Sequence, residues 1–251
     1  SENGFFRFTG KLESMQCLVE DYVYDDLNTT AQQLINCGLN NLFGEIYWFY
    51  PSNSSEVVNR MVSYNYLDSS PQRQIWVTSS LNRTTWSDSA VFGKPHGTKY
   101  TAGNDVSFDV VGNTEGRTAY FEHETGTDQV EAGSVSAIAA SVESGDYDIT
   151  VTKEGGATLQ GDGEFLMKIR RFLPDFISQT GNTQITLNLR DYPNSSQASS
   201  PLGPFTISSS TTKVDTRARA RAVSLKIANT GTSQDWKLGT FRLDIQPDGR
   251  R

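Results

Sequence analysis

Hydrophobic and polar residues alternate along most of this chain in short runs. The runs EIYWFY (45–50), VVNRMVSYNYL (57–67) and RQIWVTS (73–79) are rich in aromatic and β-branched residues, which favour strands. A cluster of Ser, Asn, Gly or Pro follows most of them. Short strands separated by turn residues at this spacing are typical of a sandwich, a barrel or a propeller. We therefore predict an all-β fold.

One segment predicts a short helix instead of a strand. Asn28 can cap the run TTAQQLINC (29–37), and Gly38 can end it. Leu34, Ile35 and Cys37 give this run a small apolar face. The rest of the chain is predicted to be strands and turns.

The spacing of the strands predicts two domains. Residues 45–86 have about the 40–45 residues of one four-stranded propeller blade. The composition then changes near Gly126, where a Gly-, Ser- and Glu-rich stretch begins. We predict propeller-like blades over 1–125, the C-terminal part of a longer propeller. Residues 126–251 are predicted to form a β-sandwich-like region, closed by a hairpin of VSLKI and WKLGTFRLDI.

Four consecutive aromatic residues, Tyr47, Trp48, Phe49 and Tyr50, lie in the first of these runs. Successive side chains of a strand point to opposite faces, so these four must occupy both faces of the sheet. This arrangement favours a strand that is buried on both sides. The alternative is an exposed aromatic platform for sugars.

Composition and charge exclude several classes of protein. The net charge of −7 argues against tight wrapping around nucleic acid, but it is compatible with a surface that DNA passes without adhering. No apolar run approaches the roughly 20 residues of a membrane helix. Cys17 and Cys37 make no disulfide framework, and we predict two free, partly buried thiols. The start at Ser1 indicates a processed product or a piece of a longer protein.

Candidate catalytic residues are few. In a strand, Glu122 and Glu124 would share one face and His123 would lie on the other, which is a poor geometry for a metal site. The two carboxylates could form an acid–base pair, but glycosidase carboxylates usually come from different strands, about 5–9 Å apart. We interpret them as surface or intersubunit charges. His96 lies in a turn, and GDGE (161–164) predicts a tight hairpin turn more than a calcium loop. We expect no catalytic residue, no metal and no cofactor.

Arg217, Arg219 and Arg221 alternate with alanines near the end of the chain. In a strand, the three guanidinium groups line one face. They could pair with carboxylates of a neighbouring subunit, or form a solvated face with weak ion pairs. We favour the first interpretation, because three identical charges along one strand repel one another unless an anion lies near.

A series of segments resembles virion proteins of short-tailed bacteriophages. The series is EIYWFYPS, NRMVSYNYLD, QIWVTSSLNRTTW, SAVFGKP, YFEHETGTD, GDGEFLMKIRRFLPDF, the three alternating arginines, and finally WKLGTFRLDIQPDGRR. In this order the segments resemble tail hub or tail nozzle proteins, which include packaged-DNA stabilisation proteins. The resemblance extends over nearly the whole chain.

The resemblance implies a propeller-like β architecture with added β domains, assembled as a hexameric ring below the portal in the phage tail. Such a ring extends the DNA channel, retains packaged DNA and permits genome ejection. The implied partners are copies of the chain, adjacent tail or adaptor proteins, and double-stranded DNA that passes without tight binding. No catalytic residue or cofactor is implied. Members of the family are usually longer, so the first blades would lie in a segment that is not present here.

We therefore expect a structural protein of the virion that is not an enzyme and does not span a membrane. In the ring, the arginines Arg217, Arg219 and Arg221 would meet Glu122 and Glu124 of a neighbouring subunit. One alternative is a carbohydrate-binding or glycan-degrading tail module for host attachment. Another alternative is a capsid-decorating sandwich.

Overall fold

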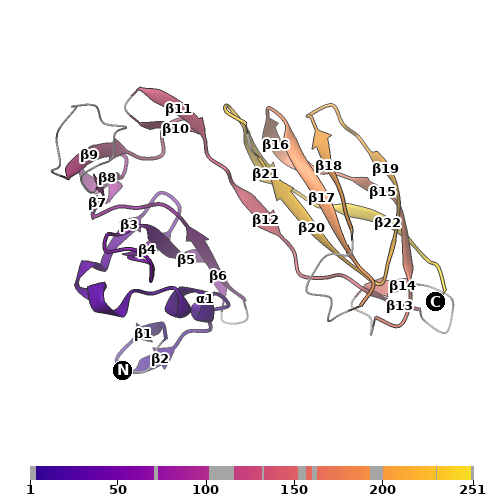
Figure 1. Ribbon diagram of the computed structural model, residues 1–251, viewed down its shortest axis with the longest axis horizontal. Coiled ribbons are helices and arrows are strands. Elements are labelled where there is room, and N and C mark those ends of the chain that lie inside the picture. Colours follow the sequence, from indigo (N-terminus) through magenta and orange to yellow (C-terminus); the bar gives the residue numbers. More distant parts are fainter. Residues whose placement is uncertain are drawn as a thin grey trace. The chain divides into compact units, whose positions relative to one another are not determined.

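The computed structural model describes residues 4–70, 73–101, 116–131, 133–151, 157–159, 163–192, 200–229 and 231–249. The chain divides into two compact units, residues 1–125 (unit 1) and 126–251 (unit 2). The described residues are mostly β and form several antiparallel sheets, none of which closes on itself (Figure 1). The prediction of an all-β class is confirmed at this level.

Unit 1 contains two short α-helices, one 3-10 helix and three described sheets. The strand orders are β1-β2, β3-β4-β5-β6 and β7-β8-β9. The elements of unit 1 are β1 (Phe6–Phe8), β2 (Leu12–Ser14), α1 (Glu20–Asp25), the 3-10 helix (Thr29–Leu34), β3 (Asn36–Asn40), β4 (Glu45–Tyr50), β5 (Arg60–Ser70), β6 (Arg73–Ser79), β7 (Thr85–Ser87), α2 (Ser89–Phe92), β8 (His96–Thr101) and β9 (Arg117–Glu122).

The aromatic strand β4 is buried on both faces. Tyr47 and Phe49 pack with Trp86 and other apolar residues in one cluster. Tyr50 lies in a second cluster, against which Trp48 packs. These side chains alternate along the strand, so each face of the sheet covers a separate group of apolar residues. The core interpretation is confirmed, and the sugar-platform interpretation of these four aromatics is wrong.

The helix predicted after Asn28 differs from the observed structure. Asn28 does cap it, because the side-chain Oδ1 accepts a hydrogen bond from the N–H of Thr30 at 3.0 Å. The segment is a 3-10 helix, however, and it ends at Leu34. Cys37 and Gly38 belong to strand β3, where they pair with β4. Pairing with the buried aromatic strand outweighs the weak helical pattern, which has no core to pack against.

The first four-stranded sheet starts earlier in the chain than predicted. It runs from β3 to β6, and Trp86 lies in β7 of the next sheet rather than at the end of a blade over 45–86. Trp86 nevertheless holds the two sheets together. Its Nε1 donates to the carbonyl of Leu39 at 2.7 Å, and its ring covers Gly38 so closely that an added Cβ would lie 2.4 Å from Cδ1.

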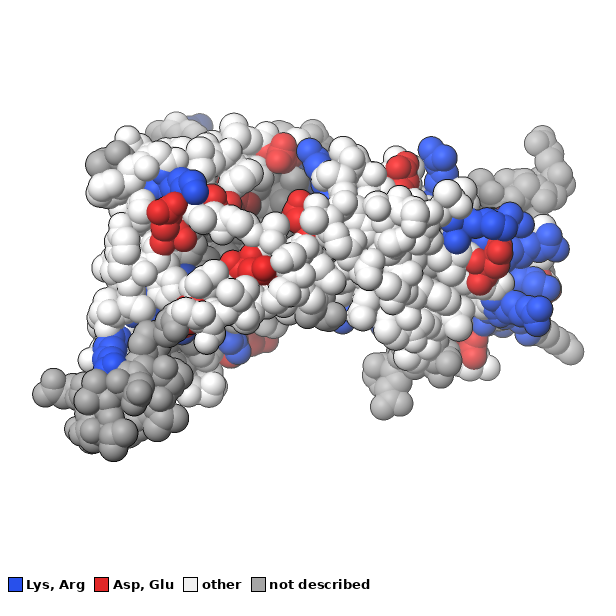
Figure 2. Space-filling model, turned by 90° about the horizontal axis from the view of Figure 1, so that it is seen from above, with Lys and Arg blue, Asp and Glu red and all other residues white. Residues whose placement is uncertain are grey.

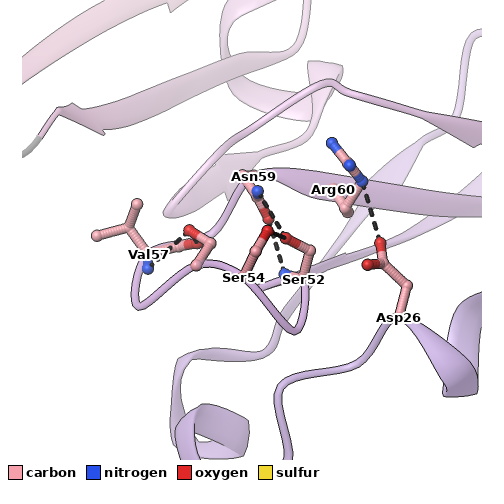
Figure 3. Close-up of polar contacts among 7 residues, drawn as sticks. Asp26, Ser52, Ser54, Val57, Asn59 and Arg60 are labelled. Carbon is pink, nitrogen blue, oxygen red and sulfur yellow. Dashed lines mark hydrogen bonds and ion pairs between the residues drawn. The ribbon is translucent and has the colours of Figure 1, made fainter.

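Polar side chains order the turn between β4 and β5 (Figure 3). Asn59 accepts from the N–H of Ser52 at 2.8 Å and donates to its hydroxyl at 2.9 Å. Beside this turn, Arg60 forms an ion pair with Asp26 at 3.2 Å. Because Ser52 is fully buried, these bonds satisfy polar groups that would otherwise lose their water partners.

Unit 2 contains two larger sheets and three two-stranded sheets. The larger sheets have the strand orders β12-β20-β17-β18 and β19-β15-β22; the smaller ones are β10-β11, β13-β14 and β16-β21. The strands of unit 2 are β10 (Asp128–Glu131), β11 (Ser134–Ala137), β12 (Ser141–Glu143), β13 (Ile149–Val151), β14 (Ala157–Leu159), β15 (Met167–Leu173), β16 (Phe176–Thr180), β17 (Thr183–Arg190), β18 (Ser200–Ile207), β19 (Val214–Ala220), β20 (Ala222–Ala228), β21 (Asp235–Leu238) and β22 (Arg242–Pro247).

Both larger sheets of unit 2 contribute to one hydrophobic core. Ile185 and Leu187 enter it from β17, and Ile169 and Phe172 enter it from β15. All four side chains are fully buried. The predicted closing hairpin is not formed: β20, which contains VSLKI, pairs with β12 and β17, whereas β21 and β22 pair with β16 and β15. Strands β20, β21 and β22 follow one another in the sequence but belong to three different sheets.

We predict that Gly38→Ala destabilises unit 1 by about 1–3 kcal/mol, because the added methyl group overlaps the Trp86 ring and the two sheets must separate. Urea unfolding followed by far-ultraviolet circular dichroism measures this change. Gly145→Ala is the control, since nothing lies within 4 Å of a Cβ added there. Equal unfolding midpoints for the two variants would contradict the packing described for Trp86.

Candidate interaction surface

The sheet β19-β15-β22 has an apolar inner face and a charged outer face. Met167, Ile169, Ala218 and Ala220 are buried in the core of unit 2. The residues between them in β15 and β19 are exposed and basic. This alternation follows from strand geometry, because successive side chains point to opposite faces. The alternating arginines and alanines therefore do form a strand, from Val214 to Ala220.

Basic side chains oppose each other across two strands of this face. Lys168 in β15 lies directly opposite Arg219 in β19. Arg217 is two residues away on the same strand face, and Arg170 occupies a bulge between Ile169 and Arg171. Like charges directly opposite each other destabilise an antiparallel pair. The arrangement is therefore unfavourable unless anions lie near it.

The aspartates of this face neutralise only part of the positive charge. Arg171 lies between two of them, with Nε 3.2 Å from Asp244 and 3.8 Å from Asp215. Asp215 also pairs with Lys213 at 3.2 Å. A third aspartate, Asp248, pairs with Arg219, which donates from Nε to the carboxylate at 2.5 Å.

In β15 and β19, three exposed basic residues remain without an ion pair to any described residue: Lys168, Arg170 and Arg217. We call these three residues and Arg219 the basic face. Figure 2 shows the concentration of Lys and Arg side chains over unit 2, with fewer Asp and Glu side chains among them. Guanidinium groups bind carboxylates and phosphates in bidentate geometry, so an exposed group of them suits an anionic partner.

Charge is also divided unequally between the two units. Residues 1–125 contain 8 Lys and Arg against 15 Asp and Glu, whereas residues 126–251 contain 14 of each. The whole net charge of −7 therefore belongs to unit 1. The chain combines one acidic unit with one neutral unit whose basic residues are concentrated on a sheet face.

Arg221 does not belong to the basic face, although the sequence pattern includes it. Strand β19 ends at Ala220, and Arg221 lies between β19 and β20. Its Nη1 donates to the carbonyls of Gly163 and Glu164, at 3.1 Å and 2.7 Å. The guanidinium of Arg221 therefore binds the backbone just before β15 in its own chain.

Glu122 and Glu124 do not share a strand face, contrary to the prediction from alternation. Strand β9 ends at Glu122, and Glu124 has a left-handed backbone with φ of 56°. Glu122 pairs with Lys94 at 3.1 Å, and this contact holds the pKa of the Glu122 carboxyl below its usual value. Glu124 accepts from Asn40 at 2.9 Å, and burial raises its pKa. Glu122 and Glu124 belong to unit 1, and the three arginines belong to unit 2.

A buried contact between Arg83 and His123 was not predicted from the sequence. Arg83 is buried, its Nε donates to His123 Nε2 at 2.9 Å, and its guanidinium lies 4.2 Å from the centre of the Phe121 ring. Burial, and then the charge of Arg83, lower the pKa of His123 to about 4. The two residues are 40 positions apart, and no spacing in the sequence pairs one with the other, so the contact was not predicted.

The described part of the chain contains neither a metal-binding group of side chains nor a membrane-spanning helix. No group of three or more His, Cys, Asp or Glu side chains could hold a metal ion there. No described helix has both the length and the apolar character needed to cross a membrane. Cys17 and Cys37 are free thiols; Cys17 is partly buried, as expected for both, whereas Cys37 is exposed.

Comparisons with known proteins did not assign the chain to a family. No protein-family model matches the chain, and no curated protein sequence matches it significantly.

We predict that unit 1 loses stability as the pH falls from about 7 to 4. The pKa of His123 is about 4 in the folded protein but near 6.5 in the unfolded chain, so protons bind preferentially to the unfolded state over this range. The expected loss in the free energy of unfolding is about 2–3 kcal/mol. Urea titrations at several pH values measure it.

The variant His123→Gln is the control for this pH dependence. Glutamine can still accept a hydrogen bond from Arg83 but does not titrate. The wild-type curve should steepen between pH 6.5 and 4 relative to the variant. Parallel curves would contradict the neutral, buried state of His123.

Proposed function

We propose that this chain is a structural component of a bacteriophage tail, a hub or nozzle protein that assembles side by side with copies of itself. In this proposal the ring of copies extends the DNA channel, retains packaged DNA and permits its ejection. The chain is a virion protein without enzyme activity, and neighbouring tail or adaptor proteins are its other partners. The ordered resemblance of its segments to such proteins is the source of this proposal.

The observation that carries the proposal is the unpaired charge of the basic face. Lys168, Arg170 and Arg217 are exposed without an ion pair to a described residue, while unit 1 of the same chain has an excess of seven carboxylates. Ring subunits need heterologous interfaces, in which one patch meets a different patch on the next copy. A chain that has both a basic surface and an acidic unit satisfies this requirement with a single sequence.

The finer architecture belongs to the same proposal. The meander β3-β4-β5-β6 has the strand number and order of one propeller blade. The two larger sheets of unit 2 share one core, as the two layers of a sandwich do. We propose a blade-like sheet in unit 1 and a sandwich-like arrangement in unit 2.

The structure refines which residues are useful for testing the contact. Arg221 and Glu124 already bind groups within their own units, and Arg219 shares its charge with Asp248. Charge reversal at Arg219 would therefore also break an internal ion pair. Lys168 and Arg217 are better positions, since a change there removes only the external charge. Glu122, although paired with Lys94, is exposed and remains a candidate on the acidic side.

The net negative charge is consistent with passage of DNA without adhesion. An acidic surface repels phosphate, and tight binding needs many Lys and Arg contacts. In the proposed ring the basic face is covered by the next copy, which leaves the acidic surface to face the channel. Salt should therefore weaken the contact between copies, since the charges that form it are solvent-exposed in the free chain.

We predict that the chain self-associates at low salt and that Lys168→Glu weakens this association at least about tenfold. Reversal of one charge in a basic patch turns an attraction into a repulsion, which costs several kcal/mol when carboxylates lie opposite. Native mass spectrometry and light scattering give the association constant, and electron microscopy of the assembled sample shows whether it is a ring with a central channel.

Lys237→Glu is the matched control. Lys237 is an exposed lysine in β21, outside the basic face, and the substitution changes the charge by the same amount. Assembly of this variant should equal that of the wild type, and both variants should retain the circular dichroism spectrum of the wild type. A chain that stays monomeric at all concentrations, or equal losses in both variants, would argue against the proposal.

A further inference from the structure

A groove lies beside strand β16 and is lined in part by the turn between β18 and β19. Strands β15 and β16 follow each other with only Pro174 and Asp175 between them. Strand β19 pairs with β15 alone, and its first paired residue, Val214, lies opposite Phe172. The chain before Val214 turns back to β18, so no described strand pairs with this edge of β16. The resulting groove has a volume of about 450 Å³, within the range of small-molecule sites.

Part of the lining of the groove is apolar. It includes Leu173, Pro174 and Phe176. Phe176 is half-buried, and its ring packs edge-on against Trp236, with the ring centres 6.3 Å apart. The contact with Trp236 fixes the orientation of the Phe176 ring.

A hydroxyl-rich turn also lines the groove and is ordered by its own hydrogen bonds. The N–H of Ser208 donates to the hydroxyl of Thr211 at 3.1 Å, and the N–H of Thr211 donates to the carbonyl of Ser208 at 2.9 Å. Gln179 spans the groove end and donates to the carbonyl of Ile207 at 2.8 Å. The shape of the groove is therefore set before any ligand binds, which lowers the entropic cost of binding.

Five polar side chains of the lining have no hydrogen bond or ion pair with a described residue. They include donors, acceptors and groups that can do both. These side chains are Asp175, Ser178, Ser209, Thr212 and Arg242.

The combination of these groups selects the class of ligand. A simple anion would be attracted by Arg242 but repelled by the carboxylate of Asp175. A simple cation would be attracted by Asp175 but repelled by Arg242. A purely apolar ligand would remove water from all five polar groups and give no hydrogen bond in return. A ligand with many hydroxyl groups and one apolar face can exchange hydrogen bonds with the serine and threonine hydroxyls, donate to Asp175 and accept from Arg242. Its apolar face can pack against Phe176.

We infer that this groove is a saccharide-binding site that accommodates one or two sugar residues. Asp175 accepts hydrogen bonds from sugar hydroxyls, Arg242 donates to sugar oxygens, and Ser209 and Thr212 exchange hydrogen bonds along the rim. Phe176 and Pro174 contact the apolar face of the sugar ring. The site shares no residue with the basic face, and sugar binding is a property beyond the proposed structural role.

Saturation-transfer difference NMR tests this inference with a defined panel: glucose, galactose, N-acetylglucosamine and glucuronic acid, each as a monosaccharide and within a disaccharide. At least one sugar should bind in the millimolar range, which is usual for a shallow site with few contacts. Asp175→Asn and Arg242→Gln should each weaken this binding about tenfold, because each removes a charged hydrogen-bonding partner.

Two further variants separate a loss of sugar binding from a loss of folding and from a change outside the groove. Ser209→Ala changes an exposed turn residue that has no bond to a described residue, so it should weaken binding without a change in thermal unfolding. Arg73→Gln removes an exposed guanidinium outside both the groove and the basic face and should leave binding unchanged. The inference is overturned if no sugar of the panel binds at about 50 mM, or if the groove variants bind as tightly as the wild type. Neither result would affect the proposal of self-assembly, which is measured independently.

Discussion

The alternation of side chains along β15 and β19 is the constraint on which the rest of unit 2 depends. The same strands that place Met167, Ile169, Ala218 and Ala220 in the core must place the residues between them in solvent. The small alanines let β19 lie close to the core, and the arginines beside them cannot turn inward without a large loss of solvation. The core and the basic face are thus two consequences of one periodic pattern.

This constraint also explains why the basic face keeps its unfavourable charge pair. Register pairs Lys168 with Arg219, and a shift of one residue that separated them would move the apolar set out of the core. Burial of the apolar residues of one sheet contributes far more to stability than exposed charges cost. The ion pair of Arg219 with Asp248 offsets part of this repulsion. Lys168 has no ion pair to a described residue, so an anionic partner would add an attraction there, and this is the physical basis of the proposed assembly.

Unit 1 depends on a different constraint, because strand β4 has large aromatic side chains on both faces. Each face needs its own cover, which Trp86 provides on one side through its contact with Gly38, while Trp76 and Phe5 pack on the other side. Burial around Trp86 extends to His123, whose ring lies 4.6 Å from it between centres. A charged histidine is unfavourable there, so Arg83 can donate to its neutral nitrogen. Packing of the aromatics around His123 thus contributes to the burial that lowers its pKa.

The sequence by itself determined the properties that are local and periodic. Strand alternation predicted an all-β chain, and the aromatic run predicted a strand buried on both faces; the structure has both. The alternating arginines predicted one charged strand face, which is correct for Arg217 and Arg219 but wrong for Arg221. Asn28 was also predicted as a cap, because capping depends on a residue and its immediate neighbours.

Only the tertiary structure decided which strands pair and which charges are already used. The strands after Ala222 do not form a hairpin, since the two sides of the core draw them into different sheets. Arg221 and Glu124 bind distant backbone and side-chain groups, and the groove beside β16 is lined in part by the turn between β18 and β19. These features come from contacts between residues that are far apart in the chain. No local pattern encodes such contacts, because their energy depends on which distant surfaces are buried together.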